Sequence, residues 1–155
     1  MQQSKRCRSE SQAQVDSFHD CHVHGFSWNR DRRTLSLSLQ YILEWVKPTS
    51  SSSAYRFSVC EAVLTFRSVI DLQVTMDWSG SALDAQIGAV RILGSRATPN
   101  GSIERHFQIE FADPDGTIAL WSLGYELLLN GEPVLSDVTS IPLVDTDPPV
   151  KNFDE

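Results

Sequence analysis

The chain has 155 residues, of which 41% are hydrophobic and 21% are charged, so it has the size and composition of one soluble domain. Its formal net charge is −7, and residues 100–155 carry only Arg105 and Lys151 against eleven acidic residues. This balance argues against nucleic-acid binding, which requires cations along the phosphate path, and it favours a basic protein partner. The apolar runs are far shorter than the about 20 residues that cross a membrane.

The targeting and cysteine signals favour a cytoplasmic protein. The first fourteen residues contain no apolar stretch typical of a signal peptide. Three cysteines, Cys7, Cys21 and Cys60, form no C-x-x-C pair, so we expect reduced, structural thiols. We expect residues 1–15 to be disordered, residues 16–136 to form a single β-rich domain, and residues 137–155 to form an irregular acidic, proline-rich tail.

Residues 19–48 predict a β-hairpin. The first strand spans residues 19–28 and has a bulge at Gly25, where the alternation of apolar residues shifts. The polar residues 29–32 form the turn. The second strand has apolar residues at every odd position from Leu35 to Trp45, a period of two that is typical of a strand with one buried face. We expect the core to form on this odd face, with Trp45 in it.

The middle of the chain predicts a second hairpin. Residues 55–66 and 72–78 alternate in polarity, and residues 67–71 would turn the chain between them. Trp78 lies on the apolar phase, so we expect it in the core. Ser81 and Asp84 could cap one helical turn in residues 79–84. A further strand over residues 87–93 leads to a polar loop around Pro99.

The last hairpin is marked by the sequence ADPDG at residues 112–116, which is typical turn chemistry. The returning strand, residues 117–129, is expected to bend at Gly124 and to end at Asn130 and Gly131. No helix-length segment separates the strands, which excludes a parallel βαβ sheet. We therefore predict an all-β, mostly antiparallel fold, either a sandwich or a strongly curled sheet, with about seven or eight strands and at most one or two short helical turns.

Asp20, His22 and His24 are the candidate metal ligands. Their period of two places three donors on one face of a strand, but no second cluster supplies a further ligand. A polar strand edge that faces solvent is therefore the preferred interpretation. The chain contains no G-x-S-x-G motif, no phosphate-binding glycine loop and no EF-hand pattern, so we predict no catalytic residue and no cofactor.

Glu110, Asp113, Asp115 and Trp121 are the candidate partner-binding residues, because they combine acidic charge with an aromatic side chain in the last hairpin. Turn formation is the alternative role of Asp113 and Asp115, and core packing is the alternative role of Trp121.

Several segments together carry a family resemblance: FHD at 18–20, YILEW at 41–45, AVLTFRSVIDLQV at 62–74, ADPDGTIAL at 112–120, GY at 124–125 and GEP at 131–133. Their order resembles a group of small bacterial β-rich proteins, some of which look like immunity proteins of polymorphic toxin systems. The resemblance covers about residues 18–135 and implies a cytoplasmic, non-enzymatic protein that binds a partner.

Three functional hypotheses follow. The first is a protein-binding domain, in its specific form an immunity protein that neutralises a basic toxin domain through an acidic surface. The second is a metal-binding protein or metal-dependent enzyme that uses Asp20, His22 and His24. The third is a small-ligand binder with an apolar cavity between sheets. The sequence does not define the oligomeric state.

Overall fold

The computed structural model describes residues 6–48, 56–77, 79 and 85–136. These residues form nine antiparallel strands and one short 3-10 helix, with no α-helix among them. The all-β antiparallel class is confirmed, and the sheet has nine strands rather than seven or eight. The elements are β1 (Arg6–Arg8), η1 (Val15–Phe18), β2 (His22–Asn29), β3 (Thr34–Val46), β4 (Arg56–Arg67), β5 (Ile70–Met76), β6 (Ala85–Ala97), β7 (Ile103–Asp113), β8 (Gly116–Ser122) and β9 (Gly124–Ser136).

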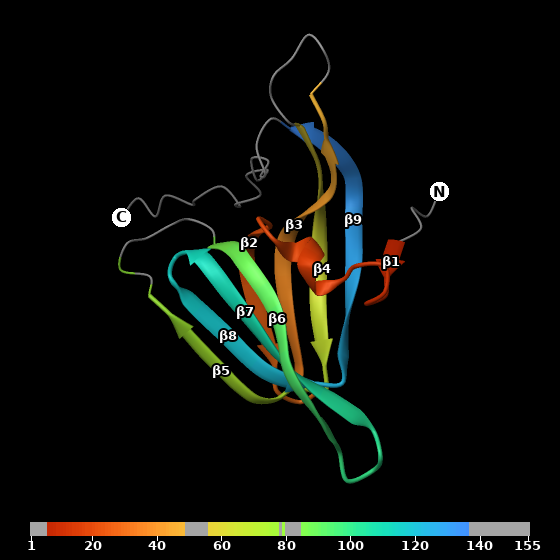
Figure 1. The fold of residues 1–155 in the computed structure, drawn as a ribbon, viewed down its shortest axis with the longest axis vertical. Helices are drawn as coiled ribbons and strands as arrows, with labels where there is room; N and C mark the ends of the chain where they lie inside the picture. The colour runs from red at the N-terminus through yellow and green to blue at the C-terminus, as the bar shows by residue number, and fades with distance from the viewer. Residues whose placement is uncertain (1–5, 49–55, 78, 80–84, 137–155) are drawn as a thin grey trace, which may run out of the picture.

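All nine strands belong to one sheet in the order β1-β9-β4-β3-β2-β6-β7-β8-β5. In Figure 1, β9, β4 and β3 run nearly vertically, and β6, β7 and β8 cross in front of them on a diagonal. Phe66 on β4 and Phe107 on β7 have three strands between them in the sheet, yet their ring centroids lie 5.2 Å apart. Such contact requires the sheet to curl back on itself, and the core lies between its two halves. The described strands do not close into a ring, because β1 and β5 do not pair.

The odd face of β3 is buried as the period of two predicts. Leu35, Leu37 and Leu39 are fully buried, and Tyr41 is nearly so. The expectation fails at Trp45, which is 49% exposed. The pairing of β3 with β4 shifts register between Ile42 and Glu44, and one extra residue reverses which face the following side chains occupy. Trp45 instead packs edge-to-face against Phe57, with ring centroids 4.8 Å apart.

Two of the three predicted hairpins are confirmed. β2 pairs with β3, with a register shift between Val23 and Gly25, and β7 pairs with β8. The hairpin predicted between β4 and β5 is wrong: β4 pairs with β3 and β9, whereas β5 pairs with β8. The connection at Ser68 and Val69 carries the chain from one half of the sheet to the other. A short polar turn between two alternating segments predicts that the chain changes direction there. It does not determine which strand pairs with the segment that follows.

The predicted strand over residues 117–129 is two strands, β8 and β9, which separate at Gly124. Gly124 has a φ of +153°, and a β-carbon there would lie 2.7 Å from Glu10 Oε2 and 2.8 Å from Arg67 Nη2. Glycine is therefore required at this bend. The predicted end at Asn130 and Gly131 is wrong, because β9 continues to Ser136 after a register shift against β4.

Residues 9–21, which we call the N-terminal strap, run from β9 to β6, and Figure 1 shows their helix η1 in front of β4. Phe18 packs against the rings of Tyr41 and Tyr125, with centroids 5.6 and 5.8 Å apart. The Asp20 amide donates to the Ile87 carbonyl at 2.9 Å. We expected disorder through residue 15; instead β1 pairs with β9 and Ala13 is fully buried. Trp78, the predicted helical turn beyond Ser79, and residues 137–155 lie outside the described residues.

Candidate functional site

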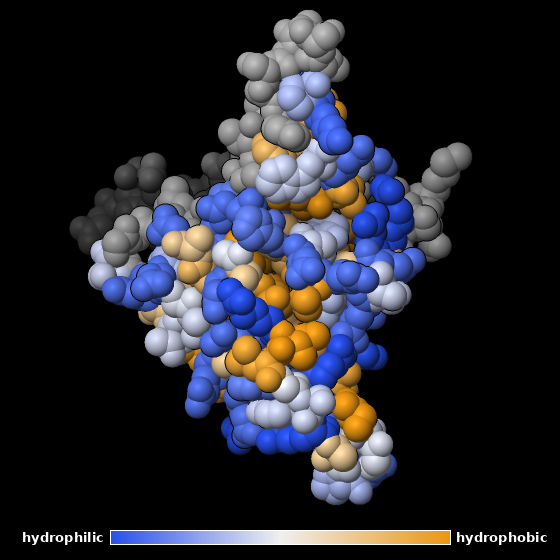
Figure 2. All heavy atoms as spheres, viewed as in Figure 1, coloured by the Kyte–Doolittle hydropathy of each residue, from blue (hydrophilic) through white to orange (hydrophobic). Residues whose placement is uncertain are grey.

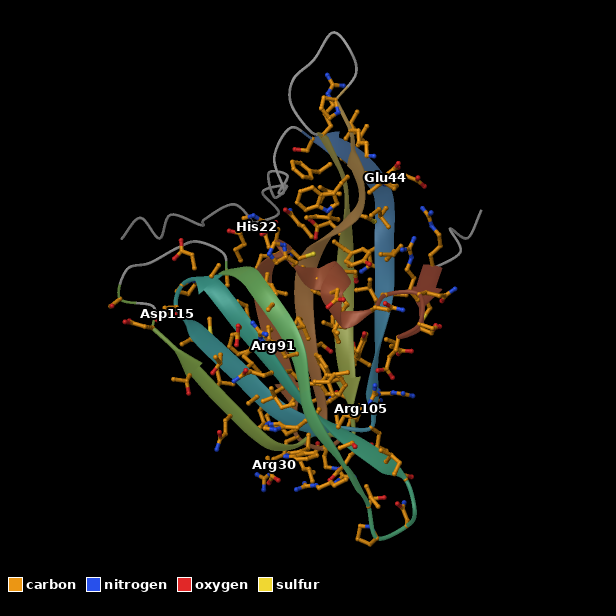
Figure 3. All side chains as sticks on the ribbon, in the orientation of Figure 1. His22, Arg30, Glu44, Arg91, Arg105 and Asp115 are labelled. Atoms are coloured by element: carbon orange, nitrogen blue, oxygen red, sulfur yellow. The ribbon has the colours of Figure 1, made fainter. Side chains whose placement is uncertain are left out.

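The candidate metal ligands at the start of β2 contact different partners. His24 Nε2 lies 3.0 Å from Glu61 Oε2, whereas the Asp20 carboxylate lies 3.0 Å from His19 Nδ1. The Gln86 amide also donates to Asp20, at 3.4 Å. Within the described ranges, no group of three or more His, Cys, Asp or Glu side chains could hold a metal ion. Figure 3 places His22 near the upper end of the sheet.

The four candidate partner-binding residues separate into two sets. Glu110 is engaged by Arg91, whose Nε and Nη2 donate to its carboxylate at 3.2 and 3.3 Å. Trp121 is half-buried and has its ring stacked on His106, with centroids 4.9 Å apart. Asp113 and Asp115 are both exposed in the turn between β7 and β8. Only these two aspartates present unengaged charge to solvent, among the four.

An arginine network covers Trp121 on the outer face of the sheet. The Arg96 guanidinium lies 4.0 Å from the centre of the Trp121 ring, where a cation is attracted to the π face. Arg96 also pairs with Glu104 on β7 and, at 3.3 Å, with Asp71 on β5. Trp121 is therefore partly covered by Arg96, and its role in partner binding stays a prediction. No sequence signal links these residues, because they come from four different strands.

The structure adds Asp77 to the exposed aspartates. The Asp77 amide donates to the Asp115 carbonyl at 3.1 Å, which ties the end of β5 to the β7–β8 turn. The hydroxyl and amide of Ser79 donate to the Asp77 carboxylate and hold its pKa below the usual range. We call Asp77, Asp113 and Asp115 the acidic tip. Sequence reasoning missed Asp77 because only the pairing of β5 with β8 brings it to this turn.

The two edges of the sheet differ in how they are protected against further pairing. β1 is three residues long and carries Arg6 and Arg8, and a short, charged edge strand discourages the addition of another strand. β5 is seven residues long, with Asp71 as its only charged residue and no proline. No described strand pairs with its outer side. Residues 72–76 lie at and after a register shift against β8 between Ile70 and Gln73, and no described strand covers their outer side, so we call them the β5 edge.

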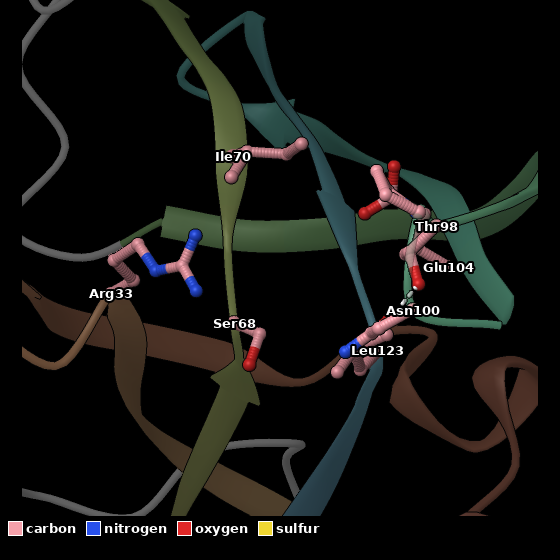
Figure 4. Close-up of a pocket in the computed structure, with 8 residues that line it drawn as sticks. Arg33, Ser68, Ile70, Thr98, Asn100, Glu104 and Leu123 are labelled. Carbon is pink, nitrogen blue, oxygen red and sulfur yellow. Dashed lines mark hydrogen bonds between the residues drawn. The ribbon is translucent and has the colours of Figure 1, made fainter. Parts of the chain in front are cut away.

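A pocket of about 490 Å³ lies at the end of the sheet remote from the acidic tip, where connections between strands meet (Figure 4). It does not match the apolar cavity of the small-ligand hypothesis, because its lining is mixed and it opens between loops. The lining residues are Arg33, Ser68, Ile70, Thr98, Pro99, Asn100, Glu104 and Leu123. The interior between the two halves of the sheet is instead filled by side chains such as Phe66, Phe107 and Tyr125.

The cysteines offer little nucleophilic chemistry. Burial raises the pKa of Cys21 to about 12, so its thiol is protonated at neutral pH. Cys60 is also fully buried, and desolvation raises its pKa. Cys7 is exposed, and all three cysteines are free.

Comparison with known proteins does not place the chain in a group. No protein-family profile matches it, no curated protein is significantly similar to it, and no solved structure matches it significantly. The resemblance to immunity proteins therefore stays a prediction. None of the described helical segments has the length and apolar character to cross a membrane.

Proposed function

We propose that the protein is a non-enzymatic protein-binding domain that pairs its β5 edge with an extended, basic segment of a partner. The observation that carries this proposal is the unequal protection of the two edges of the sheet. β1 is short and carries two arginines, whereas residues 72–76 of β5 have neither charge nor proline. An open edge of this kind offers main-chain donors and acceptors to an incoming strand.

The side chains of β5 supply specificity along such a pairing. Val74 is 44% exposed and lies opposite Ile118, which is fully buried, so Val74 continues the apolar inner face outward. Gln73 and Thr75 are exposed and alternate with it. A partner strand would therefore meet one apolar position flanked by two polar ones, which favours an incoming strand of the same alternating pattern.

The negative charge near β5 favours a basic partner and predicts at which end of the partner strand its basic residues lie. The acidic tip adjoins the C-terminal end of β5, where Met76 pairs with Gly116. At the other end of β5, Asp71 is paired with Arg96. The uncompensated negative charge therefore lies beside Asp77, and lysines or arginines of the partner strand are expected there. A basic toxin domain, the partner of the immunity-protein hypothesis, is one member of this class.

Selection of peptides from a displayed random library against the immobilised protein tests the proposal. The selected peptides should combine alternating β-branched residues with lysine or arginine at one end. Binding of a synthetic selected peptide should weaken about tenfold or more in Val74→Lys, because a lysine on the edge strand blocks pairing. Ile103→Lys is the matched control, since Ile103 is 58% exposed on the distant β6–β7 hairpin.

Charge is tested in the same assay. Asp77→Asn together with Asp115→Asn should weaken binding more at 50 mM than at 300 mM NaCl, because salt screens exposed charges. Amide hydrogen exchange along residues 72–76 should slow when the peptide binds. The proposal is wrong if Val74→Lys and Ile103→Lys reduce binding equally, or if exchange along β5 does not change.

A further inference from the structure

Two adjoining pockets occupy the end of the sheet remote from the acidic tip. The first, of about 490 Å³, has Arg33 on its wall, and the second, of about 320 Å³, has Arg67 on its wall. Ser68 and Leu123 line both pockets. Figure 4 shows the Arg33 guanidinium directed toward the strand that carries Ser68 and Ile70. Each of the two pockets therefore combines one arginine with Ser68.

Neither arginine forms an ion pair with a described residue, although Arg67 Nη2 and Glu10 Oε2 both lie within 2.8 Å of the position that a β-carbon on Gly124 would occupy. Arg67 also lines a third pocket together with Glu10 and Glu126. The side chains of Arg33 and Arg67 form no hydrogen bond or ion pair within the part of the chain that the structure describes, and neither does the Ser68 hydroxyl. Arg33 and Arg67 are both exposed, and two half-buried or buried carboxylates at this end are engaged by other arginines. Glu104, on the wall of the first pocket, binds Arg96, and Glu10 binds Arg105 at 2.7 Å.

Further positive charge lies close to Arg33. Arg30 and Arg32 are exposed in the same β2–β3 connection as Arg33, with Asp31 as the only carboxylate in that connection. Figure 3 shows Arg30 at the lower end of the molecule and Asp115 well above it, at about mid-height. An anion would be attracted to the lower end despite the net charge of −7.

The backbone that carries these groups is held on both sides. The Val69 amide donates to the Arg33 carbonyl at 2.8 Å. The Arg67 carbonyl accepts from the Ser122 hydroxyl at 2.6 Å and from the Leu123 amide at 3.2 Å. Arg33 and Ser68 have φ values of 51° and 49°, which non-glycine residues adopt when a fixed turn requires it. Binding a ligand here therefore costs little ordering of the main chain.

From this arrangement we propose that Arg33, Arg67 and Ser68 form a binding site for a small oxyanion, a phosphate-type or carboxylate group free in solution. A guanidinium presents paired N–H donors that match two oxygens of such a group, and the hydroxyl of Ser68, which lines both pockets, supplies a further donor. The site is independent of the β5 edge, and its function does not require a protein partner.

Isothermal titration of the full chain at constant ionic strength, with inorganic phosphate, pyrophosphate and acetate as separate ligands, tests this site. The expected result is saturable one-to-one binding that weakens about tenfold or more in Arg33→Gln and in Arg67→Gln, since each removes charged hydrogen bonds. Ser68→Ala should weaken binding by a smaller factor. Preference for phosphate over acetate, or the reverse, identifies which oxyanion class the site takes.

Arg30→Gln and Arg32→Gln are the matched controls, because each removes the same charge from the same connection without touching either pocket lining. They should change the affinity less than twofold. Thermal unfolding of every variant checks that the fold persists, and a variant that unfolds is replaced by the corresponding Lys substitution, which keeps the charge but loses the paired donors. Equal losses in Arg30→Gln and Arg33→Gln, or no saturable binding of any of the three anions to the unaltered protein, would overturn the proposal.

Discussion

The hydroxyl of Tyr125 on β9 donates a hydrogen bond of 2.7 Å to the carbonyl of Ala13 in the N-terminal strap. Both groups are buried, and burial raises the pKa of Tyr125 well above its ordinary value. A buried carbonyl needs a donor, so this bond holds the strap against β9. The strap therefore acts as part of the core, because its residues Ala13, Phe18 and Cys21 are buried in the same cluster as the strands' inner side chains.

Tyr125→Phe should lower the free energy of unfolding by about 1–2 kcal/mol, because the Ala13 carbonyl stays buried without its donor. Urea denaturation followed by tryptophan fluorescence measures the change. Tyr41→Phe is the control, since the described residues supply no hydrogen-bond partner for the Tyr41 hydroxyl although its ring also packs against Phe18. Equal effects of the two substitutions would show that the strap does not depend on this bond.

Leu39→Asp should prevent folding, whereas Ser38→Asp should be tolerated. Leu39 is fully buried on the inner face of β3, and an unpaired carboxylate there costs several kcal/mol, comparable with the net stability of a domain. Ser38 lies on the opposite face, half-exposed and paired with Val63. Soluble expression and far-ultraviolet circular dichroism of the two variants give the comparison. Equal loss of folded protein in both would contradict the face assignment.

The sequence predicts which face of a strand is buried better than it predicts which strands pair with each other. The burial of Leu35, Leu37 and Leu39 follows from a local period of two, which needs no knowledge of the rest of the fold. The exposure of Trp45 depends on one extra residue in the pairing with β4. The placement of β5 beside β8 depends on contacts between distant segments, and neither feature leaves a local pattern.

The candidate sites also combine features that a local pattern predicts with features that depend on contacts between distant segments. Turn chemistry predicts exposed Asp113 and Asp115, and the structure places both on the surface. The addition of Asp77 to the acidic tip, the covering of Trp121 by Arg96, and the approach of Arg33 to Ser68 each require the sheet topology. Charged residues in these three places look like ordinary surface residues in the sequence, so pattern alone could not single them out.

Gly124→Ala should lower the free energy of unfolding by about 1–3 kcal/mol, because the position has positive φ and the new methyl group would meet Glu10 and Arg67. Gly94→Ala is the matched control. A β-carbon at Gly94 meets nothing within 4 Å, so the change there should stay within about 1 kcal/mol. Thermal unfolding of both variants measures the difference. A Gly124→Ala protein as stable as the Gly94→Ala protein would contradict the required bend between β8 and β9.

Cys7 should be the one thiol that reacts with Ellman's reagent in the folded protein at pH 8. The thiolate is the reactive form, and the pKa of about 12 at Cys21 leaves almost none of it at that pH. Cys60 is shielded by complete burial, and desolvation also raises its pKa. Cys7 is exposed, although partial desolvation and the Glu126 carboxylate, 3.6 Å from its sulfur, raise its pKa and should slow the reaction relative to free cysteine.

The reaction should therefore release one equivalent of thionitrobenzoate from the folded protein and three after unfolding in guanidinium chloride. Cys7→Ser should release none when folded and two when unfolded. Glu126→Gln should accelerate the reaction of Cys7, because removal of the negative charge lowers the pKa of the thiol and increases the thiolate fraction at pH 8. Rapid release of two or three equivalents from the folded protein would show that Cys21 or Cys60 is not buried, and would contradict the packing of the N-terminal strap or of β4 in the core.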